Sequence, residues 1–401
     1  MPYSMRVLAI CIAIAAPASA GEPAWKYVAD DAFRPVPRSV PLSDTRPDDL
    51  REDVAYRGKQ RKYAQVRYGS EDSRRVTVVI DLASADDWDL YVDADRHRVI
   101  EARDKIAGSG RQRTARLDVE ITRGLALRHE PRTVLWRLGT GQKSISLATV
   151  GYVAGHVQLA GKRIAARRVD GDANGFFADA ADRLWLDLNG DGQWDPISEQ
   201  FPLLPVLTLG KERYSVRGDA LGTKLAIEPL TAEGRIRLRL ARLGRDATVA
   251  RLHVMLVAED GAAFTITSVD RPVVVPAGKY ALGAVSLSLE HGGAPVHFVF
   301  SRTGLDSSVR WHDLRKDQEL VLDPIGTLRF DLEIDKEGLK PRAGTTIQVQ
   351  PQLFTQDGLL INSCAHGDAE LASRYGQGRG ASVTLCDARH KVLDTQTSGF
   401  A

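Results

Sequence analysis

Apolar and polar residues alternate with a period of two along many short stretches of this chain. The clearest is 234–240, where arginines separate Ile236, Leu238 and Leu240, as expected for a strand with one buried face. Other alternating or β-branched stretches occur at 76–80, 264–267, 284–289, 296–300 and 346–350. A 3.6-residue apolar period is scarce, and the best candidate for a short helix is 368–375. The pattern predicts a mainly β, multi-domain protein built from antiparallel, sandwich-like modules.

Glycine, aspartate and proline separate these stretches and divide the chain into zones. Their residue types predict hairpin turns at 259–261, 276–278, 291–293 and 356–358. The predicted organisation is a signal peptide at 1–20, an extended Pro- and Arg-rich segment at 21–58, a β-rich domain with calcium loops at 59–230, a sandwich-like module at 231–325 and a β-rich C-terminal module at 326–401. The Asp-Pro-Ile-Gly turn at 323–326 sets the last boundary.

Length and charge narrow the class of protein. A chain of 401 residues suggests two or three domains, taking about 150 residues for each. With 43% apolar and 26% charged residues the chain can bury cores, which excludes wholesale disorder. A formal net charge of +2 argues against a dedicated nucleic-acid-binding protein, because such proteins usually carry a large basic excess.

The first twenty residues have the pattern of a secretory signal peptide. Arg6 precedes an apolar run at 7–16, and a small-x-small triplet follows at 18–20. The run is too short to cross a hydrocarbon core of about 30 Å as a helix, and no later segment is as apolar. A lipoprotein signal ending at Cys11 is the alternative, but the bulky Ile10 disfavours it. We therefore expect an exported protein, periplasmic or extracellular, without a membrane span.

Two cysteines remain after removal of the signal peptide. Cys364 and Cys386 form an even pair in an oxidising compartment, which predicts a disulfide worth about 3 kcal/mol in the chain-entropy model. The alternatives are two buried thiols, or a metal site completed by His366 or His390, whose spacing matches no zinc pattern.

The strongest chemical signal lies at 187–199. Its sequence places oxygen-bearing side chains at loop positions 1, 3, 5 and 9, with Gly192 at position 6. Calcium takes six to eight oxygen ligands at about 2.3–2.6 Å, and a loop supplies them by curling around the ion, with a glycine at the sharp turn. The predicted ligands are Asp187, Asn189, Asp191, Gln193 through its carbonyl group, Asp195 and, at position 13, Glu199.

A second segment, at 170–182, repeats this arrangement in register. Acidic or amide side chains occupy positions 1, 3 and 5, Gly175 occupies position 6, and an acid again falls at position 13. Its predicted ligands are Asp170, Asp172, Asn174 and Asp182. For both segments the alternative is an ordinary Asp/Asn/Gly turn, which is common between strands. The shared register favours calcium.

A degenerate copy of the same pattern, at 93–105, precedes both segments. Asp93 and Asp95 match positions 1 and 3, but His97, Arg98 and Lys105 replace the position-5 ligand, the glycine and the late acid. Because cations at these positions oppose a divalent ion, we expect no calcium in this copy.

The loops at 170–182 and 187–199 resemble the calcium loops of EF-hands, dockerins, thrombospondin type III repeats and the integrin β-propeller. They differ from an EF-hand because position 12 is Ala181 or Ser198 and because the flanking segments look like strands. The acid at position 9 of the later loop is closer to the integrin type. The resemblance implies a structural clamp rather than a helix-opening switch. As a whole, the chain resembles exported bacterial proteins.

Other candidate features have plainer alternatives. Cations and aromatics interleave at 57–68, as in a polyanion-binding groove, but nearby acids favour a salt-bridged, solvated face. For an exported protein, an acidic polysaccharide is a more sensible polyanion than nucleic acid. Trp88, Trp185 and Trp194 lie near the loops, where they could stack on sugars or anchor the core, and apolar neighbours favour the core for Trp185.

The sequence favours a binding protein over an enzyme. It contains no serine elbow, no zinc-binding histidine pair on a helix and no phosphate-binding glycine loop. The leading hypothesis is an exported, calcium-binding, non-catalytic binding or structural module of the cell envelope, with an envelope protein or a polysaccharide as its partner. The alternative is a carbohydrate-active enzyme or carbohydrate-binding protein with structural calcium, whose catalytic carboxylates would be defined by distance in space and not by spacing in sequence.

Overall fold

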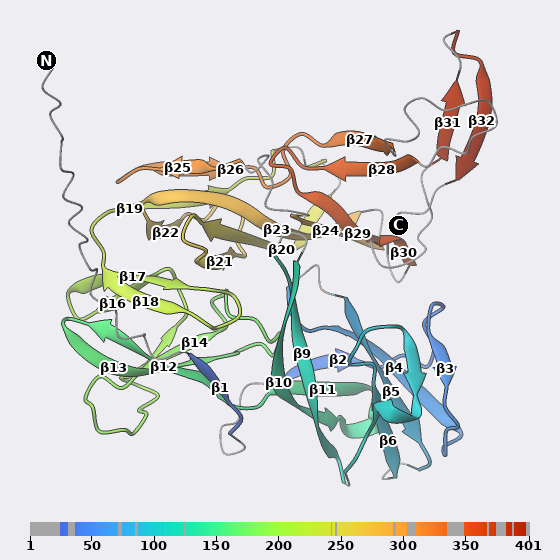
Figure 1. Cartoon of the computed structure of the whole chain (residues 1–401), viewed down its shortest axis with the longest axis horizontal. Helices are drawn as coiled ribbons and strands as arrows, with labels where there is room; N and C mark the ends of the chain where they lie inside the picture. Colours follow the sequence, from blue (N-terminus) through green and yellow to red (C-terminus); the bar gives the residue numbers. More distant parts are fainter. Residues whose placement is uncertain are drawn as a thin grey trace, which may run out of the picture.

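The computed structural model describes residues 25–397, except 31–36, 71–73, 85–86, 109, 124–125, 242, 245–246, 292–293, 303–309, 335–348, 367–368, 374–381 and 387–388. The described residues form three two-sheet sandwiches, and the third lies across the other two (Figure 1). The mainly β, antiparallel prediction is confirmed. Helix is limited in these residues to the short 3₁₀ turns η1 (Ala102–Asp104) and η2 (Thr140–Gln142). Within this described part, no helix has the length and apolarity needed to span a bilayer.

The first sandwich is built from alternating strands that point one face inward. One sheet has the order β4-β5-β6-β8 and the other β2-β11-β10-β9. Leu117 and Val119 of one sheet pack with Ile80 and Leu90 of the other in a common core, as period-two alternation requires. The strands are β2 (Arg38–Pro41), β4 (Gln60–Arg67), β5 (Arg75–Leu82), β6 (Trp88–Val92), β8 (Lys105–Ile106), β9 (Gln112–Arg123), β10 (Ala126–Leu138) and β11 (Ser144–Thr149), with the parallel pair β3 (Arg51–Asp53) and β7 (Val99–Glu101) beside them.

The second sandwich follows directly in the chain. Its larger sheet, β1-β12-β13-β14-β15, packs on the sheet β16-β17-β18. Leu184 and Leu186 of the larger sheet share a core with Val216 and Ile227 of the smaller one. The strands are β1 (Lys26–Val28), β12 (Tyr152–Leu159), β13 (Lys162–Val169), β14 (Arg183–Leu186), β15 (Gln200–Pro202), β16 (Val206–Leu209), β17 (Glu212–Gly218) and β18 (Leu225–Pro229).

The third sandwich contains the rest of the described chain apart from a terminal hairpin. The sheet β22-β19-β26 packs on a large sheet with the order β21-β20-β23-β24-β29-β28-β27, to which β25 and β30 add. Its strands are β19 (Glu233–Leu238), β20 (Thr248–Ala258), β21 (Ala263–Ile266), β22 (Val273–Pro276), β23 (Gly278–His291), β24 (Ala294–Ser301), β25 (His312–Leu314), β26 (Glu319–Leu322), β27 (Arg329–Ile334), β28 (Val349–Phe354), β29 (Leu360–His366) and β30 (Ala369–Ser373). The hairpin of β31 (Ser382–Cys386) and β32 (Val392–Thr397) projects from it (Figure 1).

Two local predictions were wrong. The segment 368–375, expected to be helical, contains β30, which pairs antiparallel with β29. Sheet pairing overrides the weak helical pattern of so short a segment. The expected hairpin turn at 276–278 instead carries the chain from β22 in one sheet to β23 in the facing sheet. The turn at 291–293 includes residues outside the described ones, although β23 and β24 pair antiparallel on either side of it.

The cores follow the predicted zones only at 230/231, which separates the second core from the third. The zone 59–230 contains two cores, one for each of the first two sandwiches. The boundary at 325/326 falls within one core, because Leu322 and Leu359 pack in the same cluster. In the segment 21–58, β1 and β2 add edge strands to the second and first sandwiches. The predicted signal peptide at 1–20 lies outside the described residues.

The two cysteines predicted to pair lie in different sheets. Cys364 is half-buried on β29, Cys386 is exposed on β31, and both thiols are free in the structure. Burial raises the pKa of the Cys364 thiol. The Cys364–Cys386 disulfide therefore stays a prediction.

Candidate functional site

The two predicted calcium loops connect neighbouring strands of the second sandwich. The second loop, 170–182, joins β13 to β14, and the third loop, 187–199, joins β14 to β15. We call the degenerate copy, 93–105, the first loop; it follows β6 in the first sandwich. Because β13, β14 and β15 pair antiparallel, the second and third loops lie at opposite ends of one sheet.

The second and third loops share one hydrogen-bond framework. The backbone N–H at position 6 donates to the carboxylate at position 1, from Gly175 to Asp170 at 2.7 Å and from Gly192 to Asp187 at 3.2 Å. The N–H groups at positions 5 and 7 donate to the side-chain oxygens at positions 3 and 5 in both loops. The N–H at position 2 donates to the acid at position 13, at 3.1 Å in the second loop and 2.9 Å in the third. The two loops, aligned in register by their sequences, therefore have the same pattern of backbone hydrogen bonds.

The first loop has the same backbone. Positions 4 and 6 have positive φ in all three loops: Arg96 (60°) and Arg98 (65°), Ala173 (57°) and Gly175 (79°), and Gly190 (74°) and Gly192 (73°). The N–H groups at positions 5 and 6 of the first loop donate to Asp93 at 3.1 Å, matching the acceptor role of position 1 elsewhere. Non-glycine residues rarely adopt this left-handed conformation, so its recurrence shows that the first loop is a structural copy.

The second loop brings its carboxylates together. Carboxylate oxygens of Asp170, Asp172 and Asp182 all lie within 4.8 Å of one another. Asp170 and Asp182 are 1% and 0% exposed, and Asp172 is half-buried. The amide of Asn174 donates to Asp172 at 3.1 Å and to Asp179 at 3.2 Å. An all-oxygen cluster of this kind suits a hard cation such as calcium.

Burial and mutual repulsion make this cluster costly to ionise. Burial is the main cause that raises the pKa of Asp172 to about 8, and the charges of Asp179 and Asp170 add to it. Burial likewise raises the pKa of Asp170, and it raises that of Asp182 well above the ordinary range. A divalent ion among these oxygens would reverse that preference, because it favours the charged carboxylates.

The second loop is buried because it docks on the first sandwich. Ala173, Phe176 and Ala178 belong to the core of that sandwich, and Gly69 N–H donates to the Asn174 carbonyl at 2.7 Å. A Cβ on Gly175 would lie 2.7 Å from the Tyr68 ring. The loop is therefore a joint between the first two sandwiches.

The third loop does not bring three of its acids together. Asp187 and Glu199 are buried, whereas Asn189, Asp191 and Asp195 are exposed. Its acids are not among the groups of described carboxylates, histidines and cysteines that converge within metal-binding distance. A hydrogen bond from Ser198 lowers the pKa of Asp195. Gln193 is exposed, and its backbone N–H donates a hydrogen bond to the Asp191 carboxylate. The sequence favoured this loop, but the structure brings the acids together in the other one.

The first loop places an imidazole where the others have a ligand. His97 Nδ1 lies 2.9 Å from Asp93 and 2.6 Å from an Asp95 oxygen. The hydrogen bond to Asp93 is the main cause that raises the pKa of His97. A protonated ring there would supply positive charge between two acids. Ligand atoms of Asp93, Asp95 and His97 also lie within 4.8 Å of one another, as those of the second loop do, so the absence of calcium from this copy stays a prediction.

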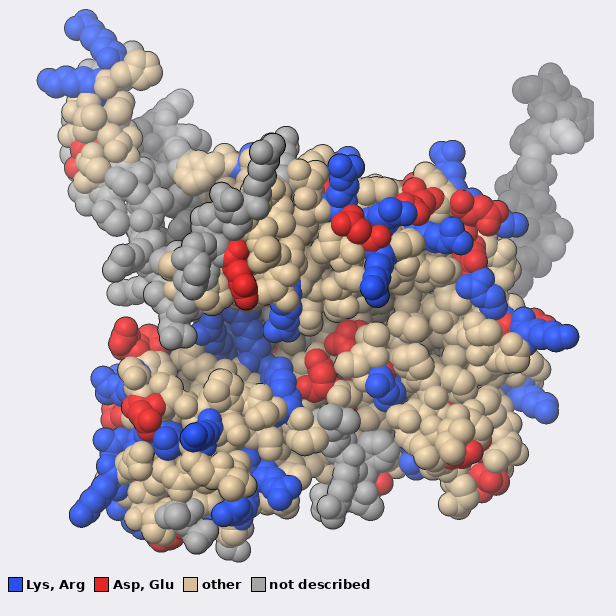
Figure 2. All heavy atoms as spheres, turned by 180° about the vertical axis from the view of Figure 1, so that it is seen from behind, with Lys and Arg blue, Asp and Glu red and all other residues tan. Residues whose placement is uncertain are grey.

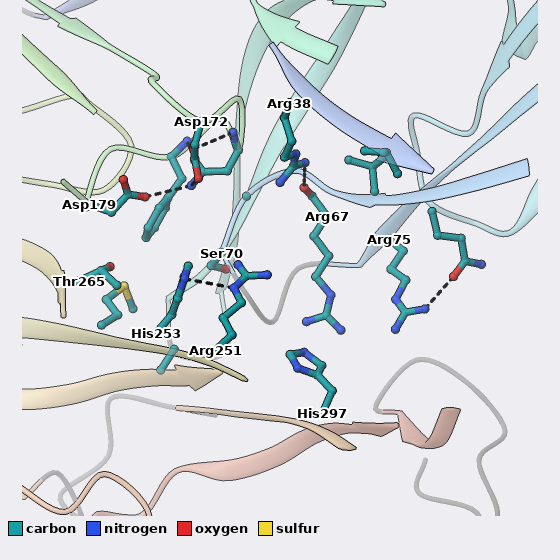
Figure 3. A pocket seen from close by; sticks show the side chains of 18 of the residues that line it. Arg38, Arg67, Ser70, Arg75, Asp172, Asp179, Arg251, His253, Thr265 and His297 are labelled. Atoms are coloured by element: carbon teal, nitrogen blue, oxygen red, sulfur yellow. Dashed lines mark hydrogen bonds between the residues drawn. The ribbon is translucent and has the colours of Figure 1, made fainter. Parts of the chain in front are cut away.

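A cleft of about 300 Å³ lies between the first and third sandwiches, with the second loop at one end. Seen from behind, the recess holds a gathering of Lys and Arg side chains, with Asp and Glu beside it (Figure 2). The basic groups reach in from both walls (Figure 3): Arg38, Arg67 and Arg75 from the first sandwich, and Arg251, His253 and His297 from the third. Asp172 and Asp179 of the second loop form the acidic end.

The sequence reasoning missed Asp179 and most of this cleft. Asp179 stands at position 10, one place beyond the acid of the third loop, so an acid count over the whole loop would have found it. The basic groups come from segments far apart in the chain, and no local pattern links them. The basic stretch 57–68 is partly a salt-bridged face, since Arg57 pairs with Asp87 at 2.6 Å and Lys62 with Asp44 at 2.8 Å, but its end contributes Arg67 to the cleft.

The tryptophans near the loops are packed. Trp88 and Trp185 are buried, and Trp194 is half-buried with its ring 4.1 Å from the Arg167 guanidinium carbon. Core anchoring is therefore confirmed for Trp185. None of the described residues lining the cleft is a tryptophan.

Comparison with known proteins adds no family: the chain matches no protein-family model, no curated protein and no solved structure.

Proposed function

We propose that this protein is an exported, calcium-stabilised binding module of the cell envelope, without a catalytic role. The observation that supports it best is the convergence of Asp170, Asp172 and Asp182 within 4.8 Å at a largely buried joint. Like charges at that separation repel strongly in a poorly solvated place, and a calcium ion with its preference for oxygen ligands removes the repulsion. Bound there, calcium would fix the first sandwich against the second.

A carbohydrate-active enzyme is the second candidate. Asp172 and Asp179 lie side by side at the cleft, bridged by the Asn174 amide, and a carboxylate pair in a cleft is what glycoside hydrolysis uses. Asp172, however, also belongs to the proposed calcium set. We therefore favour binding over catalysis at this cleft.

The test is a calorimetric calcium titration of the purified protein, with melting temperatures measured with and without chelator. We expect calcium to bind and chelator to lower the melting temperature. Asp182→Asn should reduce the stoichiometry by one, because it removes the charge of the most buried ligand while nearly keeping its shape.

Asp81→Asn is the matched control. Asp81 is 1% exposed and accepts backbone N–H groups from Arg57 and Gly58, as the loop acids do, but it lies outside the loops. It should leave the calcium stoichiometry unchanged. If wild-type protein binds no calcium and chelator does not change its melting temperature, the calcium proposal is wrong.

A further inference from the structure

The cleft between the first and third sandwiches gathers more positive than negative side chains. Among the described residues that line it, four are arginines and two are aspartates. Both aspartates belong to the second loop at one end, so the remaining length is basic. Guanidinium groups placed together repel one another, and an anionic ligand would offset that repulsion.

Two of the arginines are oriented by hydrogen bonds to neutral acceptors, and Arg38 also attracts the Asp172 carboxylate at the acidic end. The Arg38 guanidinium donates to the Arg67 carbonyl at 2.8 Å, and the Arg75 guanidinium donates to the Gln65 amide oxygen at 2.8 Å. Both acceptors are neutral, so they orient the guanidinium groups without neutralising them. Within the described chain, the buried Nε of Arg38 has no hydrogen-bond partner. The guanidinium groups of Arg38 and Arg75 therefore place positive charge along this wall of the cleft.

The opposite wall adds oriented groups. Arg251 Nε donates to His253 Nε2 at 3.1 Å, and His297 Nδ1 lies 2.9 Å from the Ser288 hydroxyl. In Figure 3, His297 points toward Arg67 across the open space, and Arg251 lies beside His253 on the same wall. A ligand in the cleft would therefore be held from two sides by forked donors, the geometry that suits carboxylate, sulfate or phosphate oxygens.

The lining disfavours ligands recognised by stacking. Apart from the imidazoles of His253 and His297, Phe176 is the one aromatic side chain among the described lining residues, and it packs into the core of the first sandwich. Single-stranded nucleic acids bind largely by stacking bases on aromatic side chains. The cleft volume of about 300 Å³ is at the small end of the range for ligand sites. It suits a short segment of a polymeric ligand.

We propose that this cleft binds an acidic oligosaccharide segment through its carboxylate groups, with Arg38, Arg67, Arg75 and Arg251 as the recognising cations. The inference rests on the proposed binding function and names its site and ligand class. Calcium in the second loop would neutralise the acidic end at Asp172 and strengthen anion binding, but the arginines do not depend on it.

The probe is tetragalacturonate, with its methyl-esterified form, maltotetraose and an oligothymidylate as comparisons, titrated calorimetrically at low ionic strength. We expect tetragalacturonate to bind with an affinity that falls as salt rises, and the uncharged sugars not to bind. Arg75→Gln and Arg251→Gln should each weaken binding about tenfold, the scale of one charge-assisted hydrogen bond. The control is Arg57→Gln. Arg57 lies in the basic stretch 57–68 that also contains Arg67, but it is ion-paired to Asp87 and does not line the cleft, so its replacement should change the affinity less than twofold.

The proposal is overturned if tetragalacturonate does not bind, if its methyl ester binds equally well, if oligothymidylate binds more tightly, or if folded cleft variants bind like wild type. The ester comparison uses wild-type protein and so does not depend on variants folding. Repeating the titrations in chelator separates the two proposals. If the protein takes up no calcium but binds tetragalacturonate through its arginines, the calcium proposal is wrong and the cleft proposal holds. If it takes up calcium but binds no tetragalacturonate, the cleft proposal is wrong and the calcium proposal holds.

Discussion

The second and third loops are built on the same thirteen-position framework yet differ in where they lie. Both direct the N–H groups of positions 2, 5, 6 and 7 to acidic or amide oxygens at equivalent positions. The second loop packs Ala173 and Phe176 into the first sandwich, whereas the third loop ends at solvent with Asp191 and Asp195 exposed. Backbone conformation alone therefore does not set how costly it is to ionise the carboxylates of a loop. Burial does, because it removes the water that would otherwise solvate the carboxylates.

The largest expected contrast comes from replacing the position-6 glycine in each loop. Gly175→Ala should destabilise the protein by about 3 kcal/mol, from left-handed strain together with a clash of the new Cβ on Tyr68 and Val119. Gly192→Ala should cost only about 1 kcal/mol, because its Cβ would meet nothing within 4 Å. Urea unfolding of the two variants measures the difference. Equal losses would show that the docking of the second loop contributes no steric constraint.

A smaller contrast concerns the calcium-dependent part of stability. With a dissociation constant near 10⁻⁴ M and about 1 mM calcium, one site adds about 1.4 kcal/mol. We expect Asp172→Ala to remove more of the chelator-sensitive rise in melting temperature than Asp191→Ala, because Asp172 lies in the converged cluster. In chelator, Asp172→Ala should be at least as stable as wild type, since it relieves repulsion from Asp170 and Asp179. A larger calcium effect of Asp191→Ala would place the stronger site in the third loop.

The smallest expected effect extends the comparison to the first loop, where an imidazole replaces a ligand. The raised pKa of His97 means that the folded state binds this proton more tightly than the unfolded chain. The resulting stabilisation is fully present below the unfolded pKa of about 6.5 and is lost as pH rises through the higher folded value. His97→Gln should remove that part of the pH dependence. Unfolding free energies of both proteins between about pH 6 and pH 8 measure it, and parallel curves would contradict the assignment.

Much of the fold could be predicted from local pattern. Stretches such as 76–80 and 234–240 became β5 and β19 because alternation directs one face of a strand to a core. The segment 368–375 misled because its helical signal is short and its pairing partner, β29, lies outside it. The predicted boundary at 230/231 separates the second core from the third, but the one at 325/326 falls inside the third core, because there the chain crosses between the two sheets of that sandwich after β26. Such a crossing has the same turn composition as a domain boundary.

The sequence by itself determined the β class and the register of the loop framework, because strand alternation and Asx-type turns depend on residues near each other in the chain. Even the first loop, with Arg98 in place of glycine, keeps the positive φ that the alignment implies. Only the tertiary structure decided which loop has clustered, buried carboxylates, and which arginines share a cleft. Both depend on contacts between sandwiches, such as Gly69 with Asn174, that join residues about a hundred positions apart. Burial and the meeting of distant charges are properties of packing, and no local pattern contains them.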